Sequence, residues 1–207
     1  MSHLKPEETA LIVVDVQNDF CHEEGSLAQK GANLEMVSSM ITPLEKVIEQ
    51  ARKAEVTVIF IQTIHEDSTD SKTWMKRFKN KEKPDVCRKG TWGSEFYRIE
   101  PHAEDIVVIK HRYSAFINTR LESVLRTKGI KSLLVTGIST NVCVESTARD
   151  GFMLDYQVVL LEDCCASFSK EAHEMTIINI DEYFGDVTTS DQILNKWMTP
   201  EPLVRTF

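Results

Sequence analysis

Apolar residues along this 207-residue chain fall into two alternating kinds of pattern. Short runs rich in β-branched residues predict strands that are buried on both faces of a sheet. Longer segments, in which apolar residues recur every three or four positions, predict helices with one buried face. Strands that alternate with helices predict an α/β fold: a three-layer α/β/α sandwich whose mostly parallel, six-stranded, Rossmann-like sheet has helices on both faces.

The expected elements can be placed from these patterns. Strands are expected at residues 9–15, 56–61, 105–110, 132–136, 157–161 and 187–188. Helices are expected at residues 33–54, 117–128, 141–154, 171–183 and 191–197. Pro43 should kink or split the first helix, because proline removes a helical hydrogen bond, and Gly129 should end the second.

One long stretch, residues 63–101, fits neither pattern. A loop of this length inside a compact domain is usually functional, so we expect a lid over a binding site or a contact between subunits. A solvated surface loop is the alternative. The chain shows no internal repeat, and its length suits a single domain over residues 1–207.

Composition narrows the classes of partner. The formal charge is 24 − 32 = −8, which disfavours nucleic acid and anionic membranes as partners. No apolar run approaches the roughly 20 residues of a membrane span, and the N-terminus lacks the apolar core of a signal peptide. The five cysteines form no Cys-x-x-Cys pair. We therefore expect a cytoplasmic protein with free thiols.

Three chemically distinct residues stand at the ends of predicted strands. Asp15 ends the first strand, Lys110 ends the third, and Cys143 follows the fourth. Ligands of open parallel sheets bind outside the carboxyl ends of the strands, so these side chains should share one edge. Taken singly, Asp15 could cap a turn and Lys110 could be a solvated strand end. A buried carboxylate needs a partner, however, and Lys110 would supply it.

Cys143 lies in the first turn of a predicted helix, after a polar elbow at residues 139–141. The positive end of a helix dipole and unpaired backbone N–H groups favour a thiolate, which is the nucleophilic form of cysteine. The alternative is a buried cysteine that only packs. The setting therefore marks Cys143 as a candidate nucleophile.

Several motifs together resemble a known family. They are Val-Val-Asp-Val-Gln-Asn-Asp-Phe at residues 13–20, Lys-His-Arg-Tyr-Ser-Ala-Phe at 110–116, Thr-Gly-Ile-Ser-Thr-Asn-Val-Cys at 136–143 and Thr-Ala-Arg-Asp at 147–150. The chain resembles the isochorismatase-like cysteine hydrolases over nearly its whole length. That family includes N-carbamoylsarcosine, biuret and ureidoacrylate amidohydrolases and the nicotinamidases.

The resemblance implies a catalytic triad of Asp15, Lys110 and Cys143 and a non-proline cis peptide at Ile138–Ser139. It implies a metal-independent amidohydrolase that cleaves a C–N bond of a small amide, carbamoyl or ureido compound through a thioester. The backbone N–H groups of Ser139 and Cys143 would form the oxyanion hole. No cofactor is implied, and the family suggests a homodimer or homotetramer.

Five further residues are candidates for substrate binding, and each is equally compatible with an ordinary structural role. They are Gln17, Phe20, Trp92, Tyr113 and Phe116. Gln17 should lie near Asp15, and the four aromatic residues should wall a pocket.

Departures from the family pattern narrow the chemistry. Nicotinamidases of this family carry a metal-binding Asp-x-His pattern, but His65 here lacks the aspartate, so we expect no metal. Isochorismatases proper cleave a vinyl ether without a thiol, so Cys143 favours amide or ureido cleavage. A vinyl ether hydrolase, a nicotinamidase and a non-catalytic assembly protein on the same fold remain the alternatives.

Overall fold

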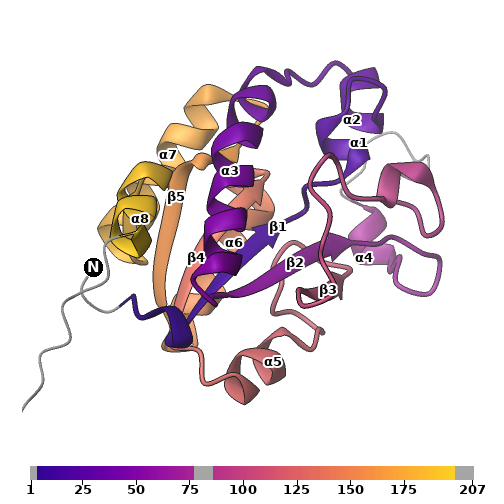
Figure 1. Cartoon of the computed structure of the whole chain (residues 1–207). Helices are drawn as coiled ribbons and strands as arrows, with labels where there is room; N and C mark the ends of the chain where they lie inside the picture. Colours follow the sequence, from indigo (N-terminus) through magenta and orange to yellow (C-terminus); the bar gives the residue numbers. More distant parts are fainter. Residues whose placement is uncertain (1–3, 77–85, 199–207) are drawn as a thin grey trace, which may run out of the picture.

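The computed structural model describes residues 4–76 and 86–198. Its centre is a six-stranded sheet in the order β3-β2-β1-β4-β5-β6, and every pair of neighbouring strands is parallel (Figure 1). The strands are β1 (Thr9–Val14), β2 (Thr57–Thr63), β3 (Ile106–Lys110), β4 (Ser132–Ile138), β5 (Gln157–Ala166) and β6 (Asp186–Thr188). The expected α/β fold is therefore confirmed, with a sheet that is wholly rather than mostly parallel.

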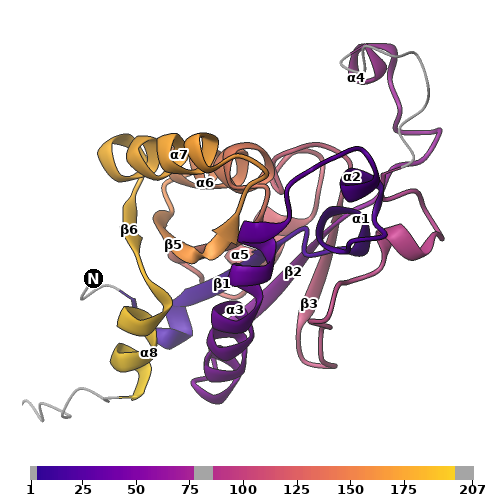
Figure 2. The same cartoon turned by 90° about the horizontal axis from the view of Figure 1, so that it is seen from above.

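Helices cover both faces of the sheet (Figure 2). The longer ones are α3 (Glu35–Lys53), α5 (Leu121–Thr127), α6 (Glu145–Met153), α7 (Lys170–Tyr183) and α8 (Ser190–Met198). Short ones are α1 (Asn18–Cys21), α2 (Ser26–Gln29), α4 (Lys72–Met75), the 3-10 turns η1 (Pro6–Glu8) and η2 (Trp92–Ser94), and the π turn η3 (Thr140–Val144). No helix among the described residues is long and apolar enough to cross a membrane.

Two apolar cores explain the unbroken hydrophobic runs of the central strands. Leu11 and Val13 of β1 pack on the side of α3 and α8, while Ala10 and Ile12 pack on the side of α5, α6 and α7. All six residues of β1 are buried. A strand covered on both faces needs apolar residues at every position, which is the pattern that the sequence displays.

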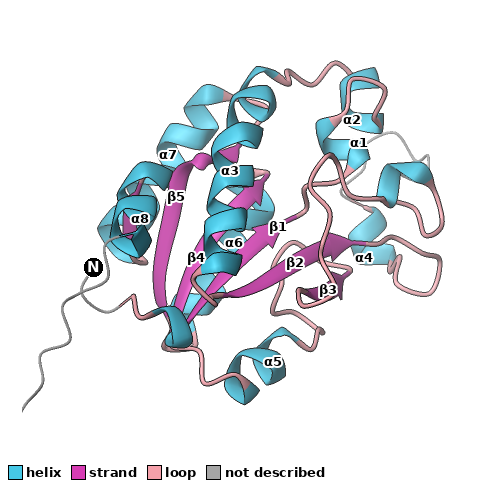
Figure 3. Cartoon of the chain, in the orientation of Figure 1, coloured by secondary structure: helices cyan, strands magenta, loops and turns pink. Residues whose placement is uncertain are grey.

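The strand order places a topological switch beside β1. The chain runs from β1 outward through β2 to β3, and then returns to the other side of β1 with β4 (Figure 3). β1 and β4 are therefore neighbours in the sheet. The chain continues from β1 towards β2 and from β4 towards β5, so the segments after these two strands diverge. Open parallel sheets bind their ligands in the crevice that opens at such a point.

Some element boundaries differ from expectation. The prediction that Pro43 splits the helix is wrong, because α3 continues through this residue. Seven buried apolar residues anchor α3 on the sheet, and their packing outweighs the one hydrogen bond that proline removes. The helix expected from residue 117 begins only at Leu121, where the Thr119 hydroxyl accepts a hydrogen bond from the Leu121 N–H group (3.1 Å). β5 continues five residues beyond the expected end, to Ala166.

Gly137 lets β4 approach β1 closely just before the switch. Its φ is +108°, and a Cβ atom there would lie 2.1 Å from the carbonyl oxygen of Val14. No real Cβ contact is that short, and the clashing atom belongs to the backbone of a central strand. Gly129 also has a positive φ, of +69°, but a Cβ atom there would meet nothing within 4 Å.

We expect Gly137→Ala to lower the free energy of unfolding by at least about 3 kcal/mol, because it adds a backbone clash to an unfavourable φ. Gly129→Ala is the matched control and should cost only about 1–2 kcal/mol, the price of the left-handed conformation. Urea denaturation measures both variants. Equal losses would contradict the close approach of β4 and β1.

Candidate active site

A cavity of about 500 Å³ opens at the carboxyl ends of the strands, which is a suitable size for a small molecule. Its lining comes from segments that are far apart in the sequence. The lining residues are Phe20, Leu27, Thr63, His65, Trp74, Val86, Lys110, Arg112, Tyr113, Ser139, Asn141, Val142, Cys143, Ser167, Phe168 and Ser169. The cavity thus contains the thiol and the ammonium group that the sequence marks as candidates.

Asp15 and Lys110 form a buried ion pair at the base of this cavity. Asp15 follows β1 directly, and Lys110 is the last residue of β3. The Lys110 Nζ atom lies 2.7 Å from Asp15 Oδ2, and the two side chains are only 1% and 0% exposed. The φ of Asp15 is +53°, a left-handed conformation that aspartate tolerates better than most residues. The expected pairing of these two residues is confirmed.

Thr63 completes this pair from the strand between them. Its hydroxyl donates to Asp15 Oδ1 (2.9 Å) and accepts from Lys110 Nζ (2.7 Å), and Lys110 also donates to the Arg112 carbonyl oxygen (3.0 Å). β2 lies between β1 and β3, so its terminal residue reaches both partners. Asp15 Oδ2 faces the Lys110 ammonium group (2.7 Å) and accepts no hydrogen bond from any other described residue.

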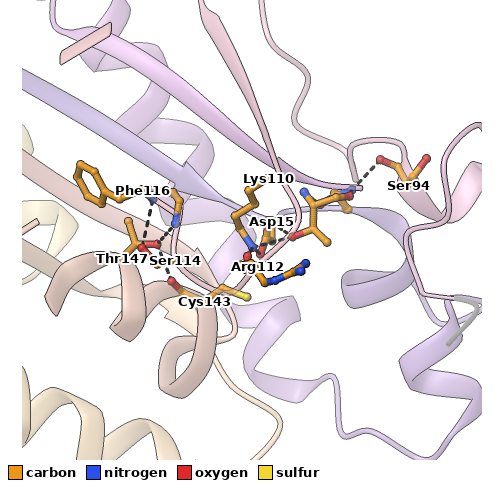
Figure 4. A network of polar contacts seen from close by, with 11 residues as sticks. Asp15, Ser94, Lys110, Arg112, Ser114, Phe116, Cys143 and Thr147 are labelled. Carbon is orange, nitrogen blue, oxygen red and sulfur yellow. Dashed lines mark hydrogen bonds and ion pairs between the residues drawn. The ribbon is translucent and has the colours of Figure 1, made fainter. Parts of the chain in front are cut away.

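Cys143 faces the ion pair from the π turn η3 (Figure 4). Its thiol lies close enough to both Asp15 and Lys110 for the two charged groups to shift its pKa in opposite directions. The Thr147 hydroxyl donates to the Cys143 carbonyl oxygen (2.7 Å) and accepts from the Ala115 N–H group (3.0 Å). This link ties the turn that carries the thiol to the loop that follows Lys110, and single π turns are frequent at functional sites.

The protonation of Cys143 differs from the sequence-based expectation. Burial raises the pKa of the Cys143 thiol to about 12, and this effect outweighs the nearby Lys110 ammonium, which lowers the pKa. Asp15 raises the pKa of the thiol further. The helix terminus was expected to favour a thiolate, but desolvation opposes the charged form more strongly.

The environment of Lys110 favours its charged form, in contrast to that of Cys143. Burial alone would lower the pKa of its ammonium group, but Asp15 and Cys143 more than offset that effect and raise the pKa. Lys110 is therefore charged at neutral pH. The site combines a neutral thiol with an ion pair whose carboxylate can act as a base.

The elbow before Cys143 contains the expected cis peptide at Ile138–Ser139. The Ser139 carbonyl oxygen accepts from the N–H groups of Val142 (3.0 Å) and Val144 (3.2 Å). Both Ser139 and Cys143 line the cavity. An oxyanion hole made by their N–H groups remains a prediction.

The aromatic candidates divide into two groups. Phe20 and Tyr113 line the cavity, whereas Trp92 and Phe116 do not. The Trp92 ring packs edge-on against His22, with ring centroids 5.0 Å apart, and Phe116 stacks on Tyr156. The expectation that Trp92 and Phe116 wall the pocket is therefore wrong: Trp92 is 45% exposed and packs on His22, and Phe116 packs on Tyr156.

Gln17 lies near Asp15 as expected, since its N–H group donates to the Asp15 carbonyl oxygen (2.8 Å), but its side chain has a structural role. Its side-chain amide is buried, donates to the carbonyl oxygens of Thr63 (2.9 Å) and Ser94 (2.8 Å), and accepts from the Thr63 N–H group (2.8 Å). These bonds occupy the amide and fix the end of β2. Gln17 therefore supports Thr63 and does not face the cavity.

Several residues that line the cavity were not predicted from the sequence. Thr63 ends β2, so the strand-end rule that selected Asp15 and Lys110 could have found it. Ser167 and Phe168 follow β5 directly, but the strand was expected to end at residue 161, which hid them. Arg112 and Trp74 carried no periodic signal that could be recognised in the sequence.

The segment 63–101 contributes to the cavity wall through His65, Trp74 and Val86. Ion pairs of Arg88 with Asp70 (2.5 Å) and Asp67 (2.8 Å) fold part of it together. Residues 77–85 lie outside the described part of the chain. A role of this segment as a lid or a subunit contact stays a prediction.

A thiol, a carboxylate and an ammonium group meet at the switch point of a parallel α/β sheet, where proteins of this fold class bind small molecules. Residues 9–192 match the family model of the isochorismatase domain. The chain belongs to the isochorismatase family.

Individual members of the family are similar to this chain in sequence and in structure. The ureidoacrylate amidohydrolase RutB of Serratia proteamaculans is 37% identical over 210 residues, which cover 94% of this chain and 85% of that protein. A cysteine hydrolase from Pseudomonas syringae pv. phaseolicola superposes with a TM-score of 0.85, at 29% identity and 94% coverage of both chains. N-carbamoylsarcosine amidase from Thermoplasma acidophilum gives a TM-score of 0.71, at 28% identity, with 89% and 97% covered. These similarities support an amidohydrolase of this family.

We expect Thr63→Val to lower kcat by about 10- to 100-fold, because it removes the hydroxyl that bridges two charged groups. Thr136→Val is the matched control: the Thr136 hydroxyl donates to the Ile12 carbonyl oxygen (3.0 Å) in the same sheet, away from the ion pair. Ammonia release from a panel of ureido, carbamoyl and amide compounds measures turnover. An equal loss in both variants would contradict a specific role of Thr63.

Proposed function

We propose that this protein is a metal-independent cysteine amidohydrolase that cleaves a C–N bond of a small ureido, carbamoyl or amide compound through a thioester. The observation that carries the proposal is the buried ion pair of Asp15 and Lys110 beside the Cys143 thiol. The names of the relatives bring ureidoacrylate forward as the first candidate substrate. Asp15, Lys110 and Cys143 form the catalytic triad in this proposal.

The first step joins proton transfer to nucleophilic attack. Because the Cys143 thiol is neutral, Asp15 must accept its proton as the sulfur attacks the carbonyl carbon. The carbonyl oxygen gains negative charge, which the N–H groups of Ser139 and Cys143 stabilise. One such donor can lower a barrier by about 3–4 kcal/mol.

The second step reverses the direction of proton transfer. Protonated Asp15 gives its proton to the nitrogen of the leaving amine, the C–N bond breaks, and an acyl or carbamoyl group stays on the Cys143 sulfur. Asp15 then takes a proton from water as the water attacks the thioester. The thiol leaves with that proton, and the product is a carboxylic or carbamic acid.

Lys110 has an electrostatic role in this scheme. Its ammonium group lies 2.7 Å from Asp15 Oδ2 and balances the charge of the carboxylate in the buried site. When Asp15 is protonated, the positive charge of Lys110 favours the negative charge that develops on the sulfur and the carbonyl oxygen. Lys110 also holds the backbone of Arg112 in place.

The alternatives fit the site less well. A vinyl ether hydrolase has no use for a thiol placed beside the base, and a non-catalytic protein has no need for a buried ion pair at the switch point. Acid, base and nucleophile are all supplied by the three side chains, so the proposal assigns no step to a metal. The homo-oligomer and the cytoplasmic location expected from the sequence remain proposals.

We expect Cys143→Ala to reduce turnover to the uncatalysed rate while the fold is retained. Cys164→Ala, which alters another buried thiol away from the cavity, is the matched control and should keep turnover. Dialysis of the wild-type enzyme against EDTA should leave its rate unchanged. Mass spectrometry after acid quenching should detect an adduct on Cys143, and its mass reports which C–N bond breaks.

Two results would contradict the proposal. Turnover that survives in Cys143→Ala would remove the nucleophile, and a stoichiometric metal whose removal abolishes turnover would overturn metal independence.

A further inference from the structure

We propose that Arg112 binds a carboxylate group of the substrate, so that the preferred substrate is an anionic ureido or carbamoyl compound. The inference rests on the proposed function and adds a specificity-determining residue to it. It is carried by the contacts of the guanidinium group and by the lack of aspartate and glutamate among the described residues that line the cavity.

The Arg112 side chain is held in one orientation by its neighbours. Nη1 donates to the carbonyl oxygens of His111 (2.6 Å) and Thr69 (3.1 Å). The guanidinium carbon lies 4.9 Å from the centre of the Trp74 ring, over its face. A guanidinium fixed at one nitrogen and stacked on an aromatic ring has lost most of its freedom before any ligand arrives.

The edge of the guanidinium that remains is suited to a carboxylate. Nε and Nη2 of Arg112 have no hydrogen-bond partner within the described residues. Their N–H groups lie side by side on one edge of the planar group and point in parallel. Such an edge matches the two oxygens of a carboxylate in a bidentate pair, which is stronger and more specific than a single contact.

The charge of Arg112 is not balanced by the protein. Nearby carboxylates are engaged with other cations: Asp70 and Asp67 pair with Arg88, and Glu66 pairs with Lys89 (2.7 Å). Arg112 forms no ion pair with any carboxylate in the described part of the chain. Lys110, the other permanently charged cation of the cavity, is already paired with Asp15.

The residues that line the cavity also favour an anionic ligand. No aspartate or glutamate is among the described residues that line it, although the chain as a whole has a formal charge of −8. Figure 4 shows Arg112 beside Lys110 and Cys143, and all three residues line the cavity. A small substrate can therefore place its carbonyl carbon at the sulfur and a carboxylate at Arg112.

A structural role is the competing explanation, because the Nη1 bonds tie Thr69 to the loop after β3. Such a role predicts equal effects on charged and neutral substrates. A carboxylate-binding role predicts an effect on the charged substrate alone. The ratio of the two specificity constants therefore separates the two explanations.

The test compares matched substrates in the full-length enzyme. The acids are ureidoacetate, 3-ureidopropionate and ureidoacrylate, and the neutral partners are alkylureas in which a branched alkyl group replaces the carboxylate, such as isopentylurea for 3-ureidopropionate. Wild-type kcat/KM should be at least about 10-fold higher for the best acid than for its neutral partner, as expected for a charge-assisted pair. Arg112→Met should reduce this ratio by about 10- to 100-fold, mainly through KM.

Two further variants sharpen the test. Arg112→Lys keeps the charge but loses the bidentate edge, so its ratio should fall between those of the wild type and Arg112→Met. Arg88→Met removes an arginine of the segment 63–101 that pairs with Asp67 and Asp70 and does not line the cavity, so it should leave the ratio unchanged. Circular dichroism checks the fold of each variant.

The outcomes are distinct. A wild-type enzyme that turns over the neutral ureas as well as the acids, or an Arg112→Met variant that loses both substrates in equal proportion, would overturn the role of Arg112 while the proposed function stands. An enzyme that cleaves neither series would overturn the amidohydrolase proposal itself.

Discussion

The buried ion pair between Asp15 and Lys110 is the interaction on which the rest of this site depends. Removing two charges from water costs several kcal/mol per ion, and it is tolerated only where their attraction and further hydrogen bonds compensate. Here the Thr63 hydroxyl and the Arg112 carbonyl oxygen supply those bonds. Because the three side chains stand at the ends of β1, β2 and β3, the parallel sheet itself sets their spacing. β4 packs closely against β1 at Gly137, and the turn that follows β4 carries the Cys143 thiol.

The same burial determines how Cys143 can react. A thiol exposed at a helix terminus would ionise easily, but this one is enclosed, and burial raises its pKa to about 12. In the proposed mechanism, the nucleophile therefore forms only when a carbonyl group is in place and Asp15 takes the proton. Such coupling protects the thiol from side reactions in the absence of substrate, because the thiolate is the reactive form of cysteine. In our proposal, Arg112 would hold an anionic substrate in the position where the attack can begin.

Sequence reasoning predicted the fold and the meeting of Asp15, Lys110 and Cys143 at one sheet edge, since both follow from strong local signals. Buried strands need continuous apolar runs, and the strand-end rule selects Asp15, Lys110 and Cys143. It failed where the outcome depends on distant contacts. Gln17 stands near Asp15 in sequence, yet its amide is used by Thr63 and Ser94; Phe116 follows the same motif as Lys110, yet it stacks on Tyr156. The pKa of Cys143 could not be predicted either, because it depends on enclosure by elements from the whole chain.

The ultraviolet absorbance of the Cys143 thiolate tests the central claim most directly. The difference spectrum between the wild-type enzyme and Cys143→Ser isolates this thiol from the other four cysteines. The account predicts no thiolate signal from Cys143 between about pH 6 and pH 9, because its pKa lies well above that range. A thiolate signal that is already complete below neutral pH would contradict it, and would show that the nucleophile is ionised before substrate binds.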